Sequence, residues 1–271
     1  MSIVAIVSFI YLLSTICYIS FLWTQNKRVT KLGFYLIITA TLIQTVNFIY
    51  LFINETQIAG GLNKSLYLFS WFISIVYIIS QIRFKAEIMG AFVAPIALIM
   101  TIPKLILPQG LIDHEQSLSN PWILTHIILM FLAEAVFTVA FIAGILYIFQ
   151  EKQIKSKHVA KFLNKLPSLT ALDKINHLSL LIGFPIVTLG LAIGLLAANE
   201  IWGQNWIWGQ KETWSIITWL LYAVLIHGRL SSGWKGRKAA FGAVLGFGII
   251  CFTFFFIGYF APGQHDFLGL K

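Results

Sequence analysis

The sequence has 271 residues, of which 58% are hydrophobic and only 11% are charged. A water-soluble domain carries about 25% charged residues, so this composition excludes a soluble enzyme. Aromatic residues make up 15% of the chain, which excludes intrinsic disorder. The composition therefore predicts an all-α integral membrane protein, a helical bundle with about eight transmembrane helices.

The net charge of +9 and the two cysteines exclude further classes of protein. In a membrane protein an excess of Lys and Arg is explained by cytoplasmic loops, so no nucleic-acid partner is expected. Cys17 and Cys251 both lie in apolar runs, and the chain has no C-x-x-C pair and no C-x-x-C-H haem-attachment site. The protein is therefore not expected to be a c-type cytochrome itself.

Eight apolar stretches of membrane-spanning length follow one another along the chain. They lie near residues 3–24, 33–53, 65–83, 87–103, 121–149, 175–198, 213–230 and 239–260. No basic residue precedes the first stretch, which argues against a cleavable signal peptide. No soluble domain is expected between the spans, so residues 1–271 are interpreted as a single transmembrane domain.

The basic residues between these stretches predict the orientation. If the N-terminus lies outside the cytoplasm, the inside segments 25–32, 83–86, 150–174 and 229–238 hold fifteen Lys and Arg residues, and the outside segments hold four. This asymmetry is typical of the positive-inside pattern, with both termini outside. The location expected from it is the bacterial cytoplasmic (inner) membrane, crossed many times.

Several polar residues lie inside or at the ends of the predicted spans. Asn120-Pro121 suits the cap and first turn of the fifth span. Gln44 and Asn47, at helical spacing, are interpreted as interhelical hydrogen-bonding residues. Glu134 lies in the middle of the fifth span, where a carboxyl group is costly. It either bonds a neighbouring helix, which is the simpler interpretation, or neutralises a ligand-bound cation.

The most informative segment is WGQNWIWGQKETW, residues 202–214, which lies between the sixth and seventh spans on the outside. Together with Trp219 it holds five of the nine tryptophans of the chain within eighteen residues. An interfacial aromatic belt explains two or three tryptophans at a membrane edge. A cluster spaced by Gly and Gln is better explained by a flat apolar ligand on which the indole rings stack.

Two histidines are predicted at the same membrane face as this segment. His126 lies at the outer start of the fifth span, and His265 follows the last span. Either histidine alone is readily explained as an interfacial polar residue, but the pair beside a tryptophan-rich shelf suits axial ligation of haem iron. His227 and His177 lie near the cytoplasmic ends of the seventh and sixth spans and could meet if those helices are neighbours. An ionisable group inside a membrane is a functional candidate, which applies to His227.

Residues 120–268 resemble the cytochrome c assembly family of membrane haem-handling proteins, of CcsA/CcmC type with a tryptophan-rich WWD signature. Residues 202–229 are similar to that signature, and residues 122–150 to the histidine-led helix of the family. Residues 166–194 and 233–240 are similar to the segment entering the next span and to the basic turn of the family. His265 falls where the family has a histidine after its last span. Residues 1–119, the first four spans, match only in general character.

The resemblance implies a set of site residues for non-covalent haem b. His126 and His265 would be the axial ligands of the iron. His227 corresponds to an intramembrane histidine implicated in haem uptake from the cytoplasmic side and is a further candidate iron ligand. Lys211, beside the shelf, is a candidate partner for a haem propionate. The porphyrin would rest on four tryptophans: Trp202, Trp206, Trp208 and Trp214.

Two departures from the family pattern bear on these assignments. The usual Trp-Asp-Pro-Lys-Glu is Trp208-Gly209-Gln210-Lys211-Glu212 here, so the loop loses a carboxylate and is more flexible. Spans one to four contain no histidine, although the family pairs two membrane histidines in its full uptake site. His177 substitutes, or a partner protein supplies the second ligand, or this site has been lost.

The resemblance implies a haem-handling protein that binds haem at the outer membrane face and presents it to apocytochrome c. This role needs no catalytic residue in the chain, although a subunit of a haem lyase remains open. A second assembly membrane protein is a possible partner, beside the lipid bilayer itself. The first alternative is a HemX-like regulator of the level of glutamyl-tRNA reductase, which would use the 150–174 loop. A transporter of another amphipathic ligand is the second.

Overall fold

A computed structural model describes residues 2–54, 61–106, 120–156, 166–202 and 209–253. Within these residues all the regular secondary structure is helical. In chain order the helices are α1 (Ile3–Thr24), α2 (Lys27–Ile53), α3 (Gly61–Phe84), the short 3-10 turn η1 (Glu87–Met89), α4 (Gly90–Ile106), α6 (Pro121–Lys155), α7 (Leu169–Trp202), α8 (Gln210–Leu230) and α9 (Arg237–Cys251). The prediction of an all-α membrane bundle is confirmed.

Each of the eight predicted spans corresponds to one of these α-helices. Six of the described helical segments are long and apolar enough to cross a membrane by length and composition, namely α1, α2, α3, η1 with α4, α6 and α7. The described part of α9 has only 15 residues, and α8 is polar at both ends. Neither helix is therefore counted among the candidate membrane spans. The predicted start of the seventh span at Thr213 is three residues late, because α8 begins at Gln210 after Gly209.

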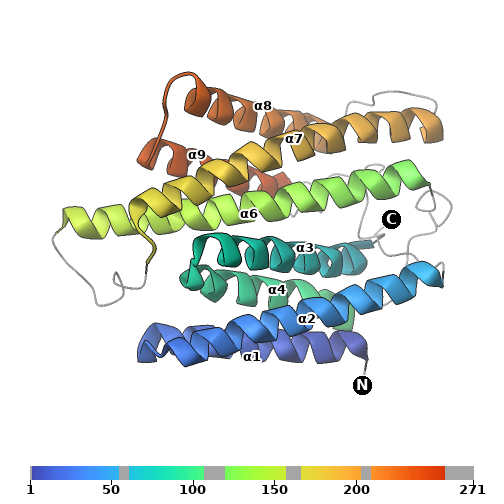
Figure 1. The fold of residues 1–271 in the computed structure, drawn as a ribbon. Helices are drawn as coiled ribbons and strands as arrows, with labels where there is room; N and C mark the ends of the chain where they lie inside the picture. The colour runs from blue at the N-terminus through green and yellow to red at the C-terminus, as the bar shows by residue number, and fades with distance from the viewer. Residues whose placement is uncertain (1, 55–60, 107–119, 157–165, 203–208, 254–271) are drawn as a thin grey trace.

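Helix α6 is the central element of the bundle (Figure 1). On one side it packs with α1–α4 in a large hydrophobic cluster, and on the other with α7, α8 and α9 in a second cluster. The predicted cap is confirmed, since the Asn120 side chain accepts a hydrogen bond from the Trp122 N–H at 2.8 Å, with Pro121 in the first turn. With 35 residues α6 is about 52 Å long, which exceeds the roughly 30 Å apolar core of a bilayer.

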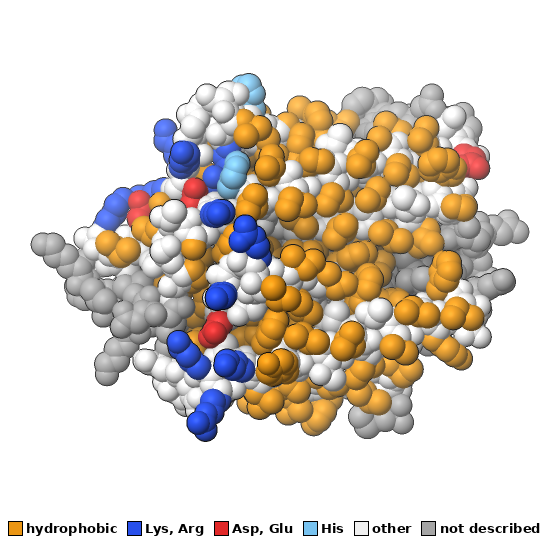
Figure 2. Space-filling model, in the orientation of Figure 1, with side chains coloured by type: hydrophobic (Ala, Val, Ile, Leu, Met, Phe, Trp, Pro, Cys, Tyr) orange, Lys and Arg blue, Asp and Glu red, His pale blue; other side chains and the backbone are white. Residues whose placement is uncertain are grey.

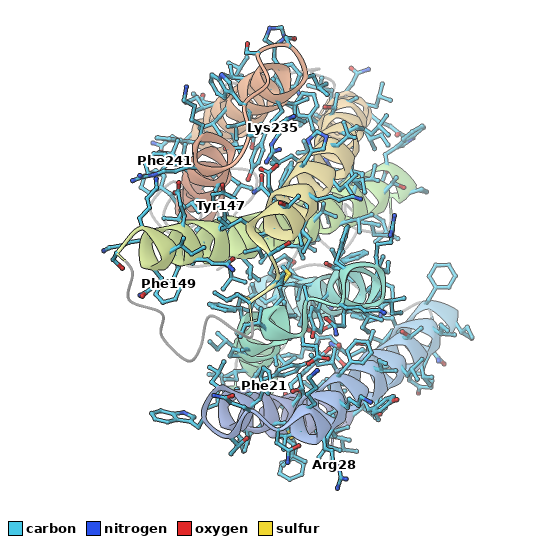
Figure 3. All side chains as sticks on the ribbon, turned by 60° about the vertical axis from the view of Figure 1, so that its left-hand side comes forward. Phe21, Arg28, Tyr147, Phe149, Lys235 and Phe241 are labelled. Carbon is cyan, nitrogen blue, oxygen red and sulfur yellow. The ribbon has the colours of Figure 1, made fainter. Side chains whose placement is uncertain are left out.

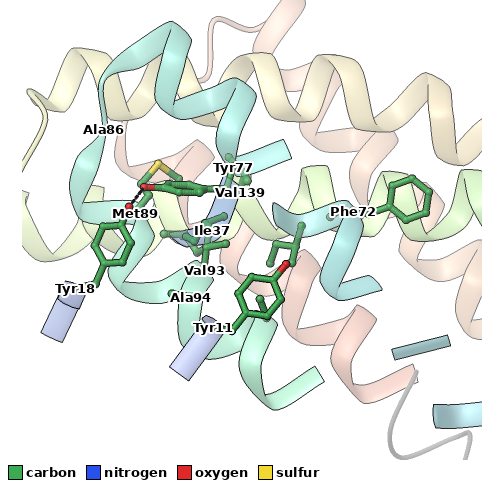
Figure 4. Packing of buried hydrophobic residues seen from close by; sticks show 14 of the residues in the cluster. Tyr11, Tyr18, Ile37, Phe72, Tyr77, Ala86, Met89, Val93, Ala94 and Val139 are labelled. Carbon is green, nitrogen blue, oxygen red and sulfur yellow. Dashed lines mark hydrogen bonds between the residues drawn. The ribbon is translucent and has the colours of Figure 1, made fainter. Parts of the chain in front are cut away.

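Hydrogen bonds between buried side chains join the first helices, and Figure 4 shows the one between Tyr18 and Tyr77. The Tyr11 hydroxyl donates to Gln44 Oε1 at 2.6 Å, and Gln44 Nε2 donates to Ser70 Oγ at 2.8 Å. Tyr18 and Tyr77 join their hydroxyls at 2.7 Å. In a bilayer these groups have no water to bond, so they pair across helices. The interhelical role predicted for Gln44 is confirmed, and that of Asn47 stays a prediction.

Basic side chains gather at one end of the bundle, where α1 meets α2, α3 meets α4 and α8 meets α9 (Figure 2). Arg28 and Lys235 lie at this end on opposite sides of the molecule (Figure 3). On the face that Figure 2 shows, the surface between the two ends is largely apolar. The Lys and Arg residues of the positive-inside pattern thus lie together at one end of the bundle. This basic end is called the inner end below, and the opposite end is called the outer end.

A polar cluster fastens α7 to α8 and to the α8–α9 connection at the inner end. Arg229, with only 4% of its side chain exposed, donates from Nη2 to Asp173 Oδ1 at 2.8 Å and to Asn176 Oδ1 at 2.7 Å. Asp173 Oδ1 also accepts the Gly236 N–H at 2.9 Å. Asn176 Nδ2 donates to the Ala140 carbonyl of α6 at 2.9 Å. The cluster therefore fixes the inner end of α8, which carries His227.

Removal of the central carboxylate tests this cluster. The substitution Asp173→Ala leaves the enclosed Arg229 guanidinium and the Gly236 N–H without their shared acceptor, so we expect it to lower the free energy of unfolding by about 2–4 kcal/mol. Thermal unfolding of the detergent-solubilised protein, followed by tryptophan fluorescence, measures the change.

The matched control is Glu151→Ala at the same end of the bundle. Glu151 pairs with Lys155 at 2.8 Å, but the Lys155 side chain is 64% exposed. Such a pair contributes at most about 1 kcal/mol. Equal effects of the two substitutions would contradict a special role of the Asp173–Arg229 pair.

Candidate functional site

His126 lies five residues into α6 at the outer end of the bundle and is half-buried. Its ring nitrogen Nδ1 lies 2.7 Å from the backbone carbonyl oxygen of Gly190 in α7. A carbonyl oxygen only accepts hydrogen bonds, so Nδ1 must carry the proton and donate it. The other ring nitrogen, Nε2, then keeps its lone pair and can bind a metal.

Close packing of α6 against α7 makes this hydrogen bond possible. The two helices are antiparallel, and three glycines of α7 face large side chains of α6: Gly194 faces His126, Gly190 faces Met130, and Gly183 faces Phe137. A Cβ atom on Gly194 would lie 2.7 Å from His126 Nδ1, and one on Gly190 would lie 2.9 Å from Met130 Sδ. Only the absence of side chains at these positions lets the imidazole reach the α7 backbone.

This packing is the part of the site that sequence reasoning missed. The signal available was the spacing Gly190-x-x-x-Gly194, which places two small residues on one face of a membrane helix and is typical of close helix contact. The sequence did not reveal that a histidine of another helix faces this surface, because that depends on how α6 and α7 are aligned.

Two tryptophans of the segment 202–219, Trp214 and Trp219, pack within the bundle. Trp214, in the second turn of α8, is half-buried and meets the Phe252 ring edge-on at a centroid distance of 4.9 Å. Trp219 stacks on Phe184 at 5.5 Å and donates from Nε1 to Thr188 Oγ1 at 2.9 Å. Trp219 therefore fastens α8 to α7, below the predicted shelf.

The other members of the predicted shelf are placed only in part. Trp202 is the last residue of α7, and Lys211 lies in the first turn of α8. Helix α7 therefore ends at the outer end, and α8 begins there. The side chains of these two residues lie outside the description. Trp206, Trp208 and His265 belong to residues that the structure does not describe, and their predicted roles stay predictions.

His227 lies at the inner end of α8, with an exposed side chain whose Nδ1 is 3.4 Å from Ser231 Oγ. It follows the first residue of α8 by seventeen positions, which is about 26 Å along a helix axis. His126 lies at the outer end of α6, so His126 and His227 cannot bind one iron atom between them.

His177 occupies the inner half of α7, where its Nδ1 atom is buried and has no hydrogen-bond partner among the described residues. The charged groups that act on it are Arg229, Asp173 and Lys235, all at the inner end. Helices α7 and α8 pack against each other, as the predicted meeting of His177 and His227 requires. Among the described interactions, however, none joins the two imidazole rings.

Comparison with known proteins places these features in a family. Residues 59–265 match the model of the family described as "Cytochrome C assembly protein". The match begins before the resemblance seen from residue 120 onwards, and it takes in α3 and α4 as well as α6–α9.

Individual relatives agree with this match. The chain is 29% identical to the "Cytochrome c biogenesis protein CcsA" of Chlamydomonas reinhardtii over 219 residues, which are 77% of this chain and 60% of that protein. It is 29% identical to the protein of the same name from Guillardia theta and 30% identical to that from Prochlorococcus marinus (strain MIT 9301), covering 77% of this chain and 75% of each relative. The chain thus spans less than two thirds of the first relative's length. With a family match over most of its length, a helical membrane bundle and an oriented histidine at the predicted position, the chain belongs to the cytochrome c assembly protein family.

Proposed function

We propose that this chain receives haem b at the outer end of its bundle and presents it for cytochrome c biogenesis. The observation that carries the proposal is the hydrogen bond from His126 Nδ1 to the Gly190 carbonyl. Histidines that bind metals almost always donate their other ring N–H to a carboxylate, a carbonyl or water, which fixes the ring and the tautomer. His126 has this arrangement.

The proposed haem site combines His126 with the tryptophan-rich segment, residues 202–214, and with His265. His265 would supply the second axial ligand, and the tryptophans of residues 202–214 would cover the porphyrin faces. Lys211 would lie at a propionate. Bound haem would be exchanged between ligands and passed to apocytochrome c, whose own cysteine thiols form the thioether bonds. The chain then acts as a binding and positioning protein.

The inner end fits an earlier step, the uptake of haem from the cytoplasmic side. His227 is exposed there, beside the cluster of Asp173, Asn176 and Arg229 that fixes its helix. A second assembly membrane protein that supplies a further ligand would account for the absence of histidine from residues 1–106. The one-sided distribution of basic residues supports an orientation with this end in the bacterial cytoplasm.

The assembly role is favoured over a HemX-like regulatory role because the relatives reported above are named for cytochrome c biogenesis. Deletion of the gene separates the two roles. We expect loss of all c-type cytochromes, detected by haem staining of membrane proteins, with an unchanged level of glutamyl-tRNA reductase. The reverse pattern would support regulation.

The visible absorption spectrum tests the outer haem site directly. We expect the purified protein, loaded with haem, to show a sharp low-spin spectrum, and the variants His126→Ala and His265→Ala each to lose or alter it, because one axial ligand is removed. The matched control is His227→Ala, which removes a histidine from the opposite end and should leave this spectrum unchanged. Retention of the spectrum in both outer variants would refute bis-histidine ligation by these residues.

A glycine substitution tests whether α7 positions the iron ligand. In Gly194→Ala the new methyl group would collide with His126 Nδ1, displacing the ring from the Gly190 carbonyl. We expect haem affinity to fall about tenfold or more, as is usual when the second partner of a metal-binding histidine is lost. Haem titration measures the affinity.

The control is Gly248→Ala in α9, where a Cβ atom meets no other atom within 4 Å. Both variants should unfold at similar temperatures if the effect is on the ring rather than on folding. Equal haem affinity in Gly194→Ala and Gly248→Ala would show that the position of the His126 ring is not set by α7.

A further inference from the structure

Two lysines meet at the outer end of the bundle, where α3 begins and α4 ends. Lys64 is the fourth residue of α3, and Lys104 is in the last turn of α4. Both side chains are half-buried, and the charge of Lys64 acts on that of Lys104. No ion pair of the described residues includes either lysine. Like charges held close together cost free energy, which an anion between them would offset.

An apolar cavity of about 140 Å³ lies deeper in the outer half of the bundle. Its walls come from four helices, with Leu66 of α3 and Met100 of α4 among the lining residues and α6 and α9 on the other side. Glu134 and Cys251 also border it, but the surface that the lining exposes is apolar. The cavity therefore suits a hydrocarbon group rather than a polar one.

The lysine pair and the cavity adjoin each other along both helices. Met100 precedes Lys104 by four residues, so the two side chains lie on one face of α4, about 6 Å apart along its axis. Leu66 follows Lys64 by two residues, which is about 3 Å along α3. Two positive charges at the membrane edge thus lie directly outside an apolar space within the membrane.

We propose that the lysine pair and the cavity together bind one phospholipid with an anionic headgroup. Its phosphate lies between Lys64 and Lys104, and part of one acyl chain enters the cavity. The volume is close to that of the engineered cavity of about 150 Å³ that binds benzene, so a short length of chain fits. Ile99 and Ile102 are exposed, so α4 borders the bilayer at this level and a lipid can enter from the side.

The charge and the size of the site select among amphipathic ligands. Two ammonium groups match a headgroup with a net negative charge better than a zwitterionic one, whose own cation offsets the phosphate. Haem also joins carboxylates to an apolar body, but its macrocycle has four pyrrole rings, whereas a cavity of this volume holds about one ring. This inference is therefore independent of haem binding.

Methionine methyl groups provide the readout. Met100 lines the cavity, whereas Met130 packs against Gly190 in the α6–α7 contact. The protein, with ¹³C-labelled methionine methyls, is placed in phosphatidylcholine nanodiscs that contain a small fraction of nitroxide-labelled lipid. The nitroxide is carried on an acyl chain near the headgroup of either phosphatidylglycerol or phosphatidylcholine. We expect labelled phosphatidylglycerol to broaden the Met100 resonance more strongly than labelled phosphatidylcholine, and both lipids to affect Met130 equally.

Lysine variants test the headgroup contact. A basic residue near a membrane surface contributes about 1 kcal/mol of attraction to anionic lipid, so Lys64→Gln and Lys104→Gln should each lower the preference for phosphatidylglycerol about fivefold. The double variant should lose it, and Lys64→Arg with Lys104→Arg should keep it because the charges remain. The matched control is Lys31→Gln at the inner end, which changes the net charge equally and should keep the preference.

A cavity variant and a soluble headgroup complete the test. Ile96 lines the cavity, so Ile96→Phe should reduce the broadening of Met100 by labelled phosphatidylglycerol to the level of labelled phosphatidylcholine. Glycerol phosphate, a headgroup without chains, should not displace the labelled lipid. The proposal is overturned if both labelled lipids broaden Met100 equally in the unaltered protein, if the preference persists without both lysines, or if glycerol phosphate displaces the lipid. Should Ile96→Phe fail to fold, the lysine variants still decide.

Discussion

The contact between α6 and α7 is the constraint on which the proposed outer site depends. Glycines on α7 allow the two backbones to approach closely enough for the Gly190 carbonyl to accept a hydrogen bond from His126. The same antiparallel alignment brings Asn176 of α7 to the Ala140 carbonyl of α6, toward the other end of the pair. One helix pair therefore sets the geometry at both ends. A small shift of α7 along α6 would release the imidazole and disturb the inner cluster together.

The two ends of the molecule have different chemistry, and this separation suits a protein that handles a ligand across a membrane. The outer end offers a half-buried imidazole whose Nδ1 donates to a backbone carbonyl, and the tryptophan-rich segment, residues 202–214, connects α7 to α8. The inner end offers an exposed histidine on a helix fixed by an enclosed arginine. Because an axial ligand must lie within bonding distance of the iron, the steps proposed for the two ends are separate. Transfer between them would require haem to leave one set of ligands for another.

The polar groups of the membrane interior fall into two kinds with different consequences. Tyr11, Gln44 and Ser70 satisfy one another across α1, α2 and α3, so they stabilise the bundle and leave no group for a ligand. Glu134 has no such partner among the described residues and borders a cavity instead. An unsatisfied group is costly in apolar surroundings unless something binds to it. The first kind therefore supports the fold, whereas Glu134 contributes no such bond among the described residues.

The sequence by itself determined the class of the protein, the order of its helices and the family to which it belongs. Hydrophobic length, the positions of Lys and Arg, caps such as Asn120-Pro121 and the tryptophan-rich segment are local properties, and they can be read without knowing which helices touch. It also singled out His126 and Glu134 as candidates, but it could not name their partners.

Those partners were decided only by the tertiary structure. Gly190 is 64 residues from His126, and the walls of the Glu134 cavity come from four helices. In a bilayer the lipid is as apolar as the helix surfaces, so hydrophobicity brings every helix into the membrane without choosing its neighbour. The choice is made by close packing of small residues and by the pairing of polar groups, which depend on the three-dimensional alignment of helices far apart in the chain.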